Sequence, residues 1–401
     1  MTTLLHRISH PAPSPTFPSP VALGLCAASF TALLIWTSVR TSFNSDSPRS
    51  IPSPASSQIP ELPEDQIKSL PYPPNALPGS RHVDSPYGRT RVYEWGPENG
   101  PRILLIHGIS TPSIALADLA HRLVAEGYRV LLFDLFGRGY SSAPCSQAHR
   151  YDSALYMSQI LLCIQSSPVP WPSFTIIGYS LGGAIAADFT SYLPNLVEGL
   201  VLVASGGLIR TKHISWKSRI LYSTAGFIPE SLIKRLVTRR LWTGPQAARS
   251  IEPEPDLSAV SSNPDEPRAG GLRSHAVYTS SQLRLLPGND YSTVSNVVDW
   301  QILHHKGFVP AFISSIRYAP IHNQHHRWKV LAENISTKAG KLREVWLVLG
   351  ETDPIIIADE MVEDAKAILG DNLKLKIVKG AAHEVAIDSA SEIVEIIKTL
   401  Q

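Results

Sequence analysis

The chain has 401 residues, of which 43% are hydrophobic, and a formal net charge of +2 at pH 7. A chain of this length can bury one large core without dividing into several domains, and it has no long stretch rich in Lys and Arg of the kind that binds nucleic acid. Cys26, Cys145 and Cys163 have neither metal-ligand spacing nor the density of a disulfide scaffold. These features favour a small-molecule or lipid partner and exclude a nucleic-acid partner.

The N-terminal region contains a candidate membrane segment. After a tail at residues 1–20, residues 21–39 carry no charge, and as a helix they would extend about 28 Å, against roughly 30 Å for the core of a bilayer. No small-x-small cleavage pattern follows, which favours an uncleaved single-pass anchor, most simply in an endomembrane, over a signal that is cleaved before secretion. A mitochondrial targeting segment is the third alternative, because residues 1–45 contain no acid. Basic residues flank both ends, so the orientation stays open.

Residues 40–79 are dense in Pro and Ser and show no periodic apolar pattern. This composition predicts an extended linker, and an arm lying on the domain surface is an equal alternative for its last part. The globular domain is therefore expected at residues 80–401.

Within this domain, strand-like runs alternate with helical stretches. Arg89–Gly96 alternates as an edge strand does, and Arg102–Gly108 is a continuous apolar run typical of a buried parallel strand. The remaining predicted elements, in chain order, are a helix at 113–126, a strand at 128–134, a helix at 153–166, a strand at 173–180, a helix at 181–193, a strand at 197–205, a strand at 343–350, a helix at 358–369, a strand at 373–380 and a helix from Ser391. This alternation predicts an α/β fold, a mostly parallel sheet with helices on both faces and with sites at the carboxyl ends of the strands.

A sharp corner is predicted at Ser180. The sequence FTIIGYSLGGAIAADF, residues 174–189, changes there from an apolar strand to a small-residue helix, with Gly178 and Gly182 on either side. Glycines at these positions let strand and helix approach closely, and a serine held between them has a strained backbone and an exposed hydroxyl. The helix that begins at Leu181 also directs free N–H groups and its positive dipole end to this point. The corner therefore predicts a nucleophilic serine.

Four motifs resemble the α/β-hydrolase family, and they are His107-Gly108, DLFGRGYS at 134–141, GYSLGG at 178–183, and GETDP at 350–354 with GAAHE at 380–384. The resemblance runs from about Arg81 to the end of the chain and is greatest to the lipase, esterase and monoacylglycerol-lipase branch. It implies an α/β-hydrolase fold with a helical cap insertion. In that family the nucleophile, the acid and the histidine follow one another in the chain, which would assign these roles to Ser180, Asp353 and His383.

Each assignment also has a physical basis. A serine hydroxyl needs a base to take its proton, and His383 lies in a small-residue loop just past the last predicted strand, although a surface histidine in a turn is the alternative. Asp353 follows another strand and would orient the imidazole and stabilise its protonated form. Glu351 and Asp388 are alternative acids, and Asp353 has the alternative role of capping the next helix.

By the same resemblance, the oxyanion donors would be the backbone N–H groups of Ile109 and Leu181. His107 would support the oxyanion loop structurally, and Asp134 is expected to structure the glycine-containing turn that it begins. No cofactor and no metal are implied by the resemblance.

The alternation of strands and helices is interrupted at about 206–337, and a cap would lie in this interval. Its apolar helical segments predict a cap over the carboxyl edge of the sheet that shapes an apolar pocket. The basic run Lys234, Arg235, Arg239 and Arg240 would suit anionic lipid head groups, but a solvated helix face is the more common role of such a run.

The same interruption is rich in histidine. His322 and His326 have the i, i+4 spacing of a metal pair, with His304, His305 and His325 nearby. The glutamate of a His-Glu-x-x-His zinc motif is missing, so solvated cap histidines are expected instead.

The sequence as a whole predicts a membrane-anchored serine hydrolase that cleaves a lipophilic carboxylic ester, monoacylglycerol-like or another small apolar ester, through an acyl-enzyme on Ser180. Hydrolysis of an amide, a thioester or a carbon–carbon bond of a secondary metabolite is the alternative chemistry on the same fold. A catalytically silent binding protein is the alternative from another class.

Overall fold

The computed structural model describes residues 49–214, 216–224, 226, 228–242 and 282–400, together with residues 29, 31 and 32. The chain divides into two compact units, Met1–Pro48 and Arg49–Gln401. The predicted tail at 1–20 lies outside the described residues, and so does the predicted membrane segment at 21–39 except for Ser29, Thr31 and Ala32, which are helical. Among the helices of the described residues, none combines the length and the apolar character that crossing a membrane requires.

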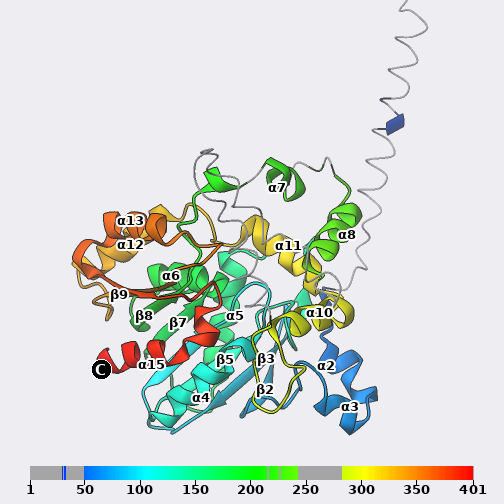
Figure 1. The fold of residues 1–401 in the computed structure, drawn as a ribbon, viewed down its shortest axis with the longest axis horizontal. Helices are drawn as coiled ribbons and strands as arrows, with labels where there is room; N and C mark the ends of the chain where they lie inside the picture. Colours follow the sequence, from blue (N-terminus) through cyan, green and yellow to red (C-terminus); the bar gives the residue numbers. More distant parts are fainter. Residues whose placement is uncertain are drawn as a thin grey trace, which may run out of the picture. The chain divides into compact units, whose positions relative to one another are not determined.

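The second unit is built on an eight-stranded sheet with the order β10-β9-β8-β7-β4-β5-β3-β2 (Figure 1). The first six strands in this order are parallel: β10 (Leu373–Val378), β9 (Val345–Gly350), β8 (Val197–Val203), β7 (Phe174–Tyr179), β4 (Arg102–Ile106) and β5 (Arg129–Phe133). Of the other two, β3 (Gly88–Trp95) pairs antiparallel with β5, and β2 (Ser80–Ser85) pairs antiparallel with β3. The strand expected at the edge, Arg89–Gly96, is therefore an interior strand, because β2 pairs along its outer side.

Helices cover both faces of this sheet. On one face, neighbouring helices contact each other in the order α5 (Ser153–Gln165), α6 (Leu181–Tyr192), α12 (His325–Ser336) and α13 (Ala358–Leu369). The other face carries η2 (Ser113–Leu116), α4 (Ala117–Ala125), α14 (Val385–Asp388) and α15 (Ala390–Thr399) (Figure 1). Successive side chains of a strand point to opposite faces, so Leu104 and Ile106 of β4 pack into the first layer while Ile103 and Leu105 pack into the second. The predicted fold class is confirmed.

Residues 49–79 are part of the second unit, which corrects the predicted linker over residues 49–79 and the predicted domain start at 80. Residues 40–48 of the predicted linker lie outside the described residues. β1 (Ser50–Ile51) pairs antiparallel with β6 (Ala143–Pro144), and α2 (Pro54–Ser57), η1 (Ile59–Glu61) and α3 (Glu64–Lys68) follow it. Tyr72 is fully buried, and its Oη lies 2.7 Å from Tyr93 Oη and 3.2 Å from a carboxylate oxygen of Asp134. Isolated aromatic anchors hold this segment, and such anchors leave no periodic pattern in the sequence.

The predicted cap insertion lies between β8 and β9. It contains η3 (Thr211–His213), α7 (Trp216–Leu221), α8 (Glu230–Leu241), α10 (Val294–His304) and α11 (Phe308–Tyr318), and residues 243–281 within it lie outside the described residues. The helices α8, α10 and α11 contact one another (Figure 1). The expected boundary at 337 is too late, because α12 packs against α6 and α13 as a part of the layer on the sheet.

Candidate active site

Ser180 stands at the corner between β7 and α6 in a backbone conformation with φ 55° and ψ −116°. Positive φ is strained for a residue that has a Cβ. The two glycines explain why the chain can turn here: a Cβ on Gly178 would lie 2.3 Å from the carbonyl oxygen of Gly182, and a Cβ on Gly182 would lie 2.1 Å from that of Ile106. The Ser180 N–H donates to Val203 O at 2.9 Å, which ties the corner to the next strand.

The structure brings Ser180, His383 and Asp353 together. His383 Nε2 lies 3.0 Å from Ser180 Oγ, and His383 Nδ1 lies 2.9 Å from Asp353 Oδ2. The side chains of His383 and Asp353 are 8% and 0% exposed, so bulk water competes little for these contacts. Each residue follows a different strand of the sheet, namely β7, β9 and β10. The carboxyl ends of parallel strands meet at one edge, which explains how residues up to 203 positions apart become neighbours.

Asp353 is the acid that contacts the histidine. Its other oxygen, Oδ1, accepts hydrogen bonds from the backbone N–H groups of Ile355 at 2.7 Å and Ile356 at 2.9 Å, so the loop-capping role and the contact with His383 coexist. Of the alternative acids, Glu351 accepts from the N–H of Gly380 at 2.9 Å. The other, Asp388, accepts from the Ser389 hydroxyl at 2.6 Å on the exterior of the domain.

An open pocket lies beside Ser180. Loops at the carboxyl ends of β4, β7, β8 and β9 contribute Ile109, Leu181, Ile209, Ile355 and Ile356, and the insertion contributes Ile214, Ile316, Ile321 and His322. The lining is thus almost entirely hydrocarbon. Such a pocket suits an apolar group of a ligand that lies beside Ser180.

Ile109 and Leu181, the predicted oxyanion donors, both line this pocket next to Ser180. Within the part of the chain that the structure describes, neither of their N–H groups donates a hydrogen bond to another group. Leu181 is the first residue of α6, where N–H groups have no partner inside the helix. Two N–H groups of residues beside Ser180 are therefore without an acceptor inside the described part of the chain.

His107 supports the loop that carries Ile109. Its Nε2 accepts from the N–H of Leu135 at 2.8 Å, so Nδ1 carries the proton and donates to Gly108 O at 2.8 Å. Burial lowers the pKa of His107 to about 3, which keeps the ring neutral. These bonds fix the ring of His107 to the loops that follow β4 and β5.

Asp134 and Arg138 organise the turn between β5 and β6. Asp134 accepts from the N–H groups of Ser113 at 2.9 Å and Tyr140 at 2.8 Å, and its burial raises the pKa of the carboxyl. Arg138, which the sequence interpretation did not single out, is fully buried and donates to Ile109 O at 3.0 Å and to Ser315 Oγ at 2.8 Å. It thereby links the loop of Ile109 to α11. The sequence signal that could have identified Arg138 is its position inside the motif DLFGRGYS.

Of the histidines expected to be solvated, His304 and His326 are exposed, whereas His305 differs from the expectation. His305 is buried, and its Nε2 contacts Ser141 O at 2.8 Å while Nδ1 accepts from Gly307 N. His322 lies before the start of α12 at His325, so it shares no helix face with His326. No group of three or more metal-ligating side chains occurs in the described residues.

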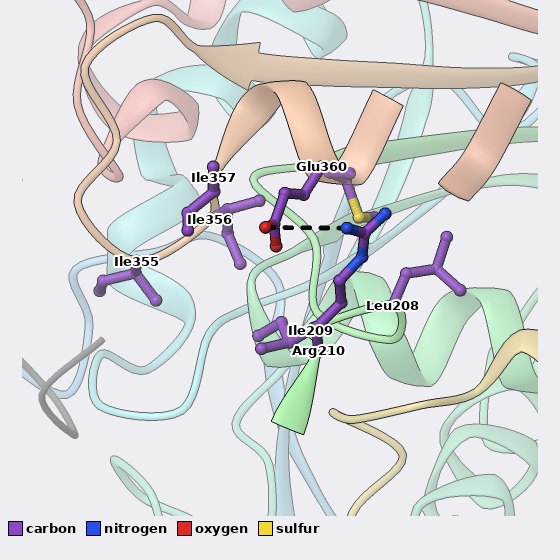
Figure 2. Close-up of a pocket in the computed structure, with 8 residues that line it drawn as sticks. Leu208, Ile209, Arg210, Ile355, Ile356, Ile357 and Glu360 are labelled. Carbon is purple, nitrogen blue, oxygen red and sulfur yellow. Dashed lines mark ion pairs between the residues drawn. The ribbon is translucent and has the colours of Figure 1, made fainter. Parts of the chain in front are cut away.

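A second pocket adjoins the first and shares Ile209, Ile355 and Ile356 with it. Figure 2 shows its polar rim, where Arg210 and Glu360 form an ion pair with 3.7 Å between Nη1 and Oε1. The guanidinium of Arg210 also pairs with Asp364 at 2.7 Å. These ion pairs hold α13 against the loop that follows β8, and thereby fix the isoleucine wall between the two pockets.

Comparison with known proteins agrees with this architecture. Residues 101–240 match the family model described as alpha/beta hydrolase fold. An uncharacterized protein of Mycobacterium tuberculosis is 35% identical over 122 residues, which cover 30% of this chain and 33% of that protein. A serine hydrolase-like protein of Danio rerio is 30% identical over 132 residues, which cover 32% of this chain and 38% of that protein. The chain spans about a third of the length of these curated relatives.

A solved structure extends the likeness to most of the chain. Carboxylesterase CesB from Bacillus subtilis is 16% identical with a TM-score of 0.51, and the match covers 84% of this chain and 94% of that one. At this identity the likeness concerns the fold alone. The sheet order, the serine corner and the family model together define the class: this chain has the α/β-hydrolase fold.

Proposed function

We propose that the protein is a serine hydrolase that cleaves a lipophilic carboxylic ester through an acyl-enzyme on Ser180. The single observation that carries this proposal is the position of His383, whose two ring nitrogens contact Ser180 Oγ and Asp353 Oδ2 at the edge of an apolar pocket. A monoacylglycerol-like or other small apolar ester is the favoured substrate, because the pocket offers mainly isoleucine side chains to it.

The proposed reaction begins when His383 Nε2 takes the proton of Ser180 Oγ as this oxygen attacks the ester carbonyl. Asp353 holds the Nδ1 proton of the ring and stabilises the imidazolium. The N–H groups of Ile109 and Leu181 stabilise the oxyanion. His383 then gives its proton to the departing alcohol, and the same ring activates a water molecule that hydrolyses the acyl-enzyme.

An amide, a thioester or an activated carbon–carbon bond would use the same residues, so these remain alternative chemistries of the same site. A silent binding protein has no need of a histidine held between a strained serine and a buried carboxylate, and that arrangement favours catalysis.

Labelling with a fluorophosphonate probe tests the proposal. The full-length protein in detergent is compared with its Ser180→Ala and His383→Ala variants, and Ser389→Ala serves as a matched surface-serine control. Labelling of the parent and of Ser389→Ala, with loss in the other two, is expected. An unlabelled parent that is correctly folded would leave the silent binding protein as the better account. Ester, amide and thioester substrates of equal chain length then separate the alternative chemistries.

We further propose that residues 21–39 anchor the protein in a membrane. Support comes from their uncharged apolar sequence, which matches the thickness of a bilayer core. Alkaline carbonate extraction tests this proposal. The full-length chain is expected in the membrane pellet, and a chain beginning at Arg49 is expected in the supernatant. Release of the full-length chain would contradict the anchor, and a shorter secreted product would indicate cleavage of a signal.

A further inference from the structure

Three isoleucines separate the two pockets. Ile209, Ile355 and Ile356 line both the pocket beside Ser180 and the pocket next to it. Figure 2 shows Ile209 on the loop that follows β8, and Ile355 and Ile356 on the loop that leads into α13. Ile356 is buried, and the side chains of Ile209 and Ile355 are half-buried. These three side chains form the isoleucine wall, which ends the space beside Ser180 in this direction.

The backbone of the isoleucine wall is fixed on both loops. Ile355 N and Ile356 N donate to Asp353 Oδ1 at 2.7 Å and 2.9 Å. On the other loop, Ile209 O accepts from Asn323 N at 3.3 Å. A fixed backbone leaves only side-chain rotamers to change when a ligand presses on the wall. The fold therefore sets the position of the wall, and the identity of its side chains sets how far it extends.

Ion pairs hold the two loops together at the rim of the second pocket. Arg210 Nη2 contacts Glu363 Oε2 and Asp364 Oδ1, each at 2.7 Å. Lys212 Nζ contacts Glu360 Oε1 at 2.9 Å. Both cations follow β8 and all three acids belong to α13. Because several contacts join the same two elements, the wall is not expected to open by separation of its two loops.

The second pocket continues the hydrocarbon surface on the far side of the wall. Leu208 and Met361 line it and are buried, and Ile357 lines it at 38% exposure. Each methylene group that moves from water onto such a surface strengthens binding by about fourfold. Space for more of an apolar chain is therefore present, but the isoleucine wall separates it from Ser180.

We propose that Ile209 and Ile355 are specificity-determining residues that limit the length of the apolar chain on the ester. The chain ends at the isoleucine wall, and the second pocket lies beyond its reach. This inference rests on the proposed function and deepens it, because it assigns the substrate to esters of limited chain length rather than to long-chain lipid esters. A longer chain must displace a packed side chain or leave its end in water, and either cost lowers kcat/KM.

Two series of esters locate the limit through kcat/KM. The p-nitrophenyl esters of even-numbered acids from butanoate to hexadecanoate vary the acyl chain, and n-alkyl acetates of the same lengths vary the alcohol. The full-length protein is assayed at one detergent concentration, with each ester below the concentration at which it aggregates. In the parent, one series is expected to fall by about tenfold or more within about two members after its optimum. In Ile355→Ala and Ile209→Ala this fall is expected about one member later, because each substitution shortens a side chain of the wall.

A block in the second pocket tests whether the added length lies there. Of the two pockets, Met361 lines the second alone, so Met361→Phe in the Ile355→Ala background is expected to return the limit to that of the parent. Ile357→Phe, at an exposed position of the same pocket, takes its place if thermal unfolding shows that Met361→Phe is not folded. Ile316→Ala is the matched control, because Ile316 lines the first pocket alone. Any length that Ile316→Ala adds is expected to persist when the second pocket is blocked.

Three results would overturn the proposal. They are the absence of a length limit in both series of the parent, an unchanged limit in both wall variants, and an added length that the folded block variant leaves in place.

Binding without turnover separates this inference from the proposed function. Calorimetry on Ser180→Ala uses the alkyl acetates and the methyl esters of the same acids. In one series, affinity is expected to rise by about fourfold per methylene up to the limit and no further, and to continue rising past it in Ser180→Ala/Ile355→Ala. If the parent is not labelled by the fluorophosphonate but this limit moves, the proposed function fails and the role of the wall stands. If the parent is labelled but neither kcat/KM nor binding responds to Ile355→Ala, the role of the wall is wrong and the proposed function stands.

Discussion

Asp353 uses its two carboxylate oxygens for two separate tasks. Oδ2 contacts His383 Nδ1 at 2.9 Å, and Oδ1 accepts from two backbone N–H groups of the loop that follows. The second task holds the carboxylate in the orientation that the first one needs. A neutral amide at this position would keep the shape of the side chain but would present an N–H₂ group or an uncharged oxygen to the imidazole.

We therefore expect Asp353→Asn to lower kcat by on the order of 10⁴-fold, because His383 loses the carboxylate that sets its tautomer and stabilises its charge. Thermal unfolding should change little, since the loop bonds can be retained. Esterase assays on purified protein measure the effect, with Glu351→Gln as the matched control, because Glu351 contacts Gly380 N instead of the histidine. Full activity in Asp353→Asn together with loss of activity in Glu351→Gln would show that Asp353 is not the acid that supports His383.

At the scale of elements, the segment at residues 49–79 closes the turn between β5 and β6. Its β1 strand pairs with β6, and Tyr72 reaches Asp134, the residue that organises the turn. The hydroxyl of Tyr140 in turn donates to the backbone carbonyl of Tyr72. The buried rings of Tyr72 and Tyr140 also contact each other, with their centroids 4.7 Å apart. The segment thus stabilises the loop system behind the site, although it lies before the first strand of the sheet.

We expect Tyr72→Phe to reduce the free energy of unfolding by about 1–3 kcal/mol, because buried groups of Tyr93 and Asp134 lose a hydrogen-bonding partner. Urea unfolding measures the change. Tyr291→Phe is the matched control, since Tyr291 is 66% exposed, and it should be neutral. A chain that begins at residue 80 should be less stable than Tyr72→Phe. Equal stability of the two tyrosine variants would contradict the anchoring role.

Arg138 couples two elements through one side chain. It donates to Ile109 O on the loop after β4 and to Ser315 Oγ on α11. We expect Arg138→Gln to lower kcat more than tenfold with a smaller change in KM, because the loop that carries Ile109, a proposed oxyanion donor, loses its support. Arg150→Gln, which removes a guanidinium stacked on Tyr318, is the control for loss of charge. A change confined to KM would instead indicate a role in substrate binding.

At the scale of the whole domain, several buried histidines make stability depend on pH. Burial lowers the pKa of His107 to about 3 and the pKa values of His305 and His322 to about 4, from an ordinary 6.5. As the pH falls below 6.5, these histidines bind protons in the unfolded chain but stay neutral in the folded chain. The stability present above pH 6.5 is therefore lost on acidification, by on the order of 2 kcal/mol per histidine between pH 6.5 and 5.

We expect the free energy of unfolding to be lower at pH 5 than at pH 7, as measured by urea titrations at both values. Burial raises the pKa of Asp134 and of Asp188, and this contribution has the opposite sign because a folded carboxyl keeps its proton to higher pH. The His305→Gln variant separates the two effects, since it removes one histidine and leaves both carboxyls. The free energy of unfolding of this variant should depend less on pH than that of the parent. An unchanged difference between pH 5 and pH 7 would exclude His305 as a contributor.

Local patterns determined the fold class and the position of the sharp corner. Strand and helix periodicity act over a few residues, and so do the steric demands that place Gly178 and Gly182 beside Ser180. The helix predicted at 358–369 agrees with α13, and the predicted strand at 343–350 contains β9. These features could be predicted because each one is decided by neighbours in the chain.

Other features depended on contacts between distant segments, and only the tertiary structure decided them. Tyr72 is buried because it meets Asp134, α12 joins the layer on the sheet because it meets α6 and α13, and His305 is buried because it meets Ser141. The polarity of the pocket beside Ser180 is likewise set by loops and helices that converge from six parts of the chain. The sequence by itself therefore determined the framework and the candidate nucleophile, whereas the folded domain decided which side chains surround them, because burial is a property of the packed chain and not of any one segment.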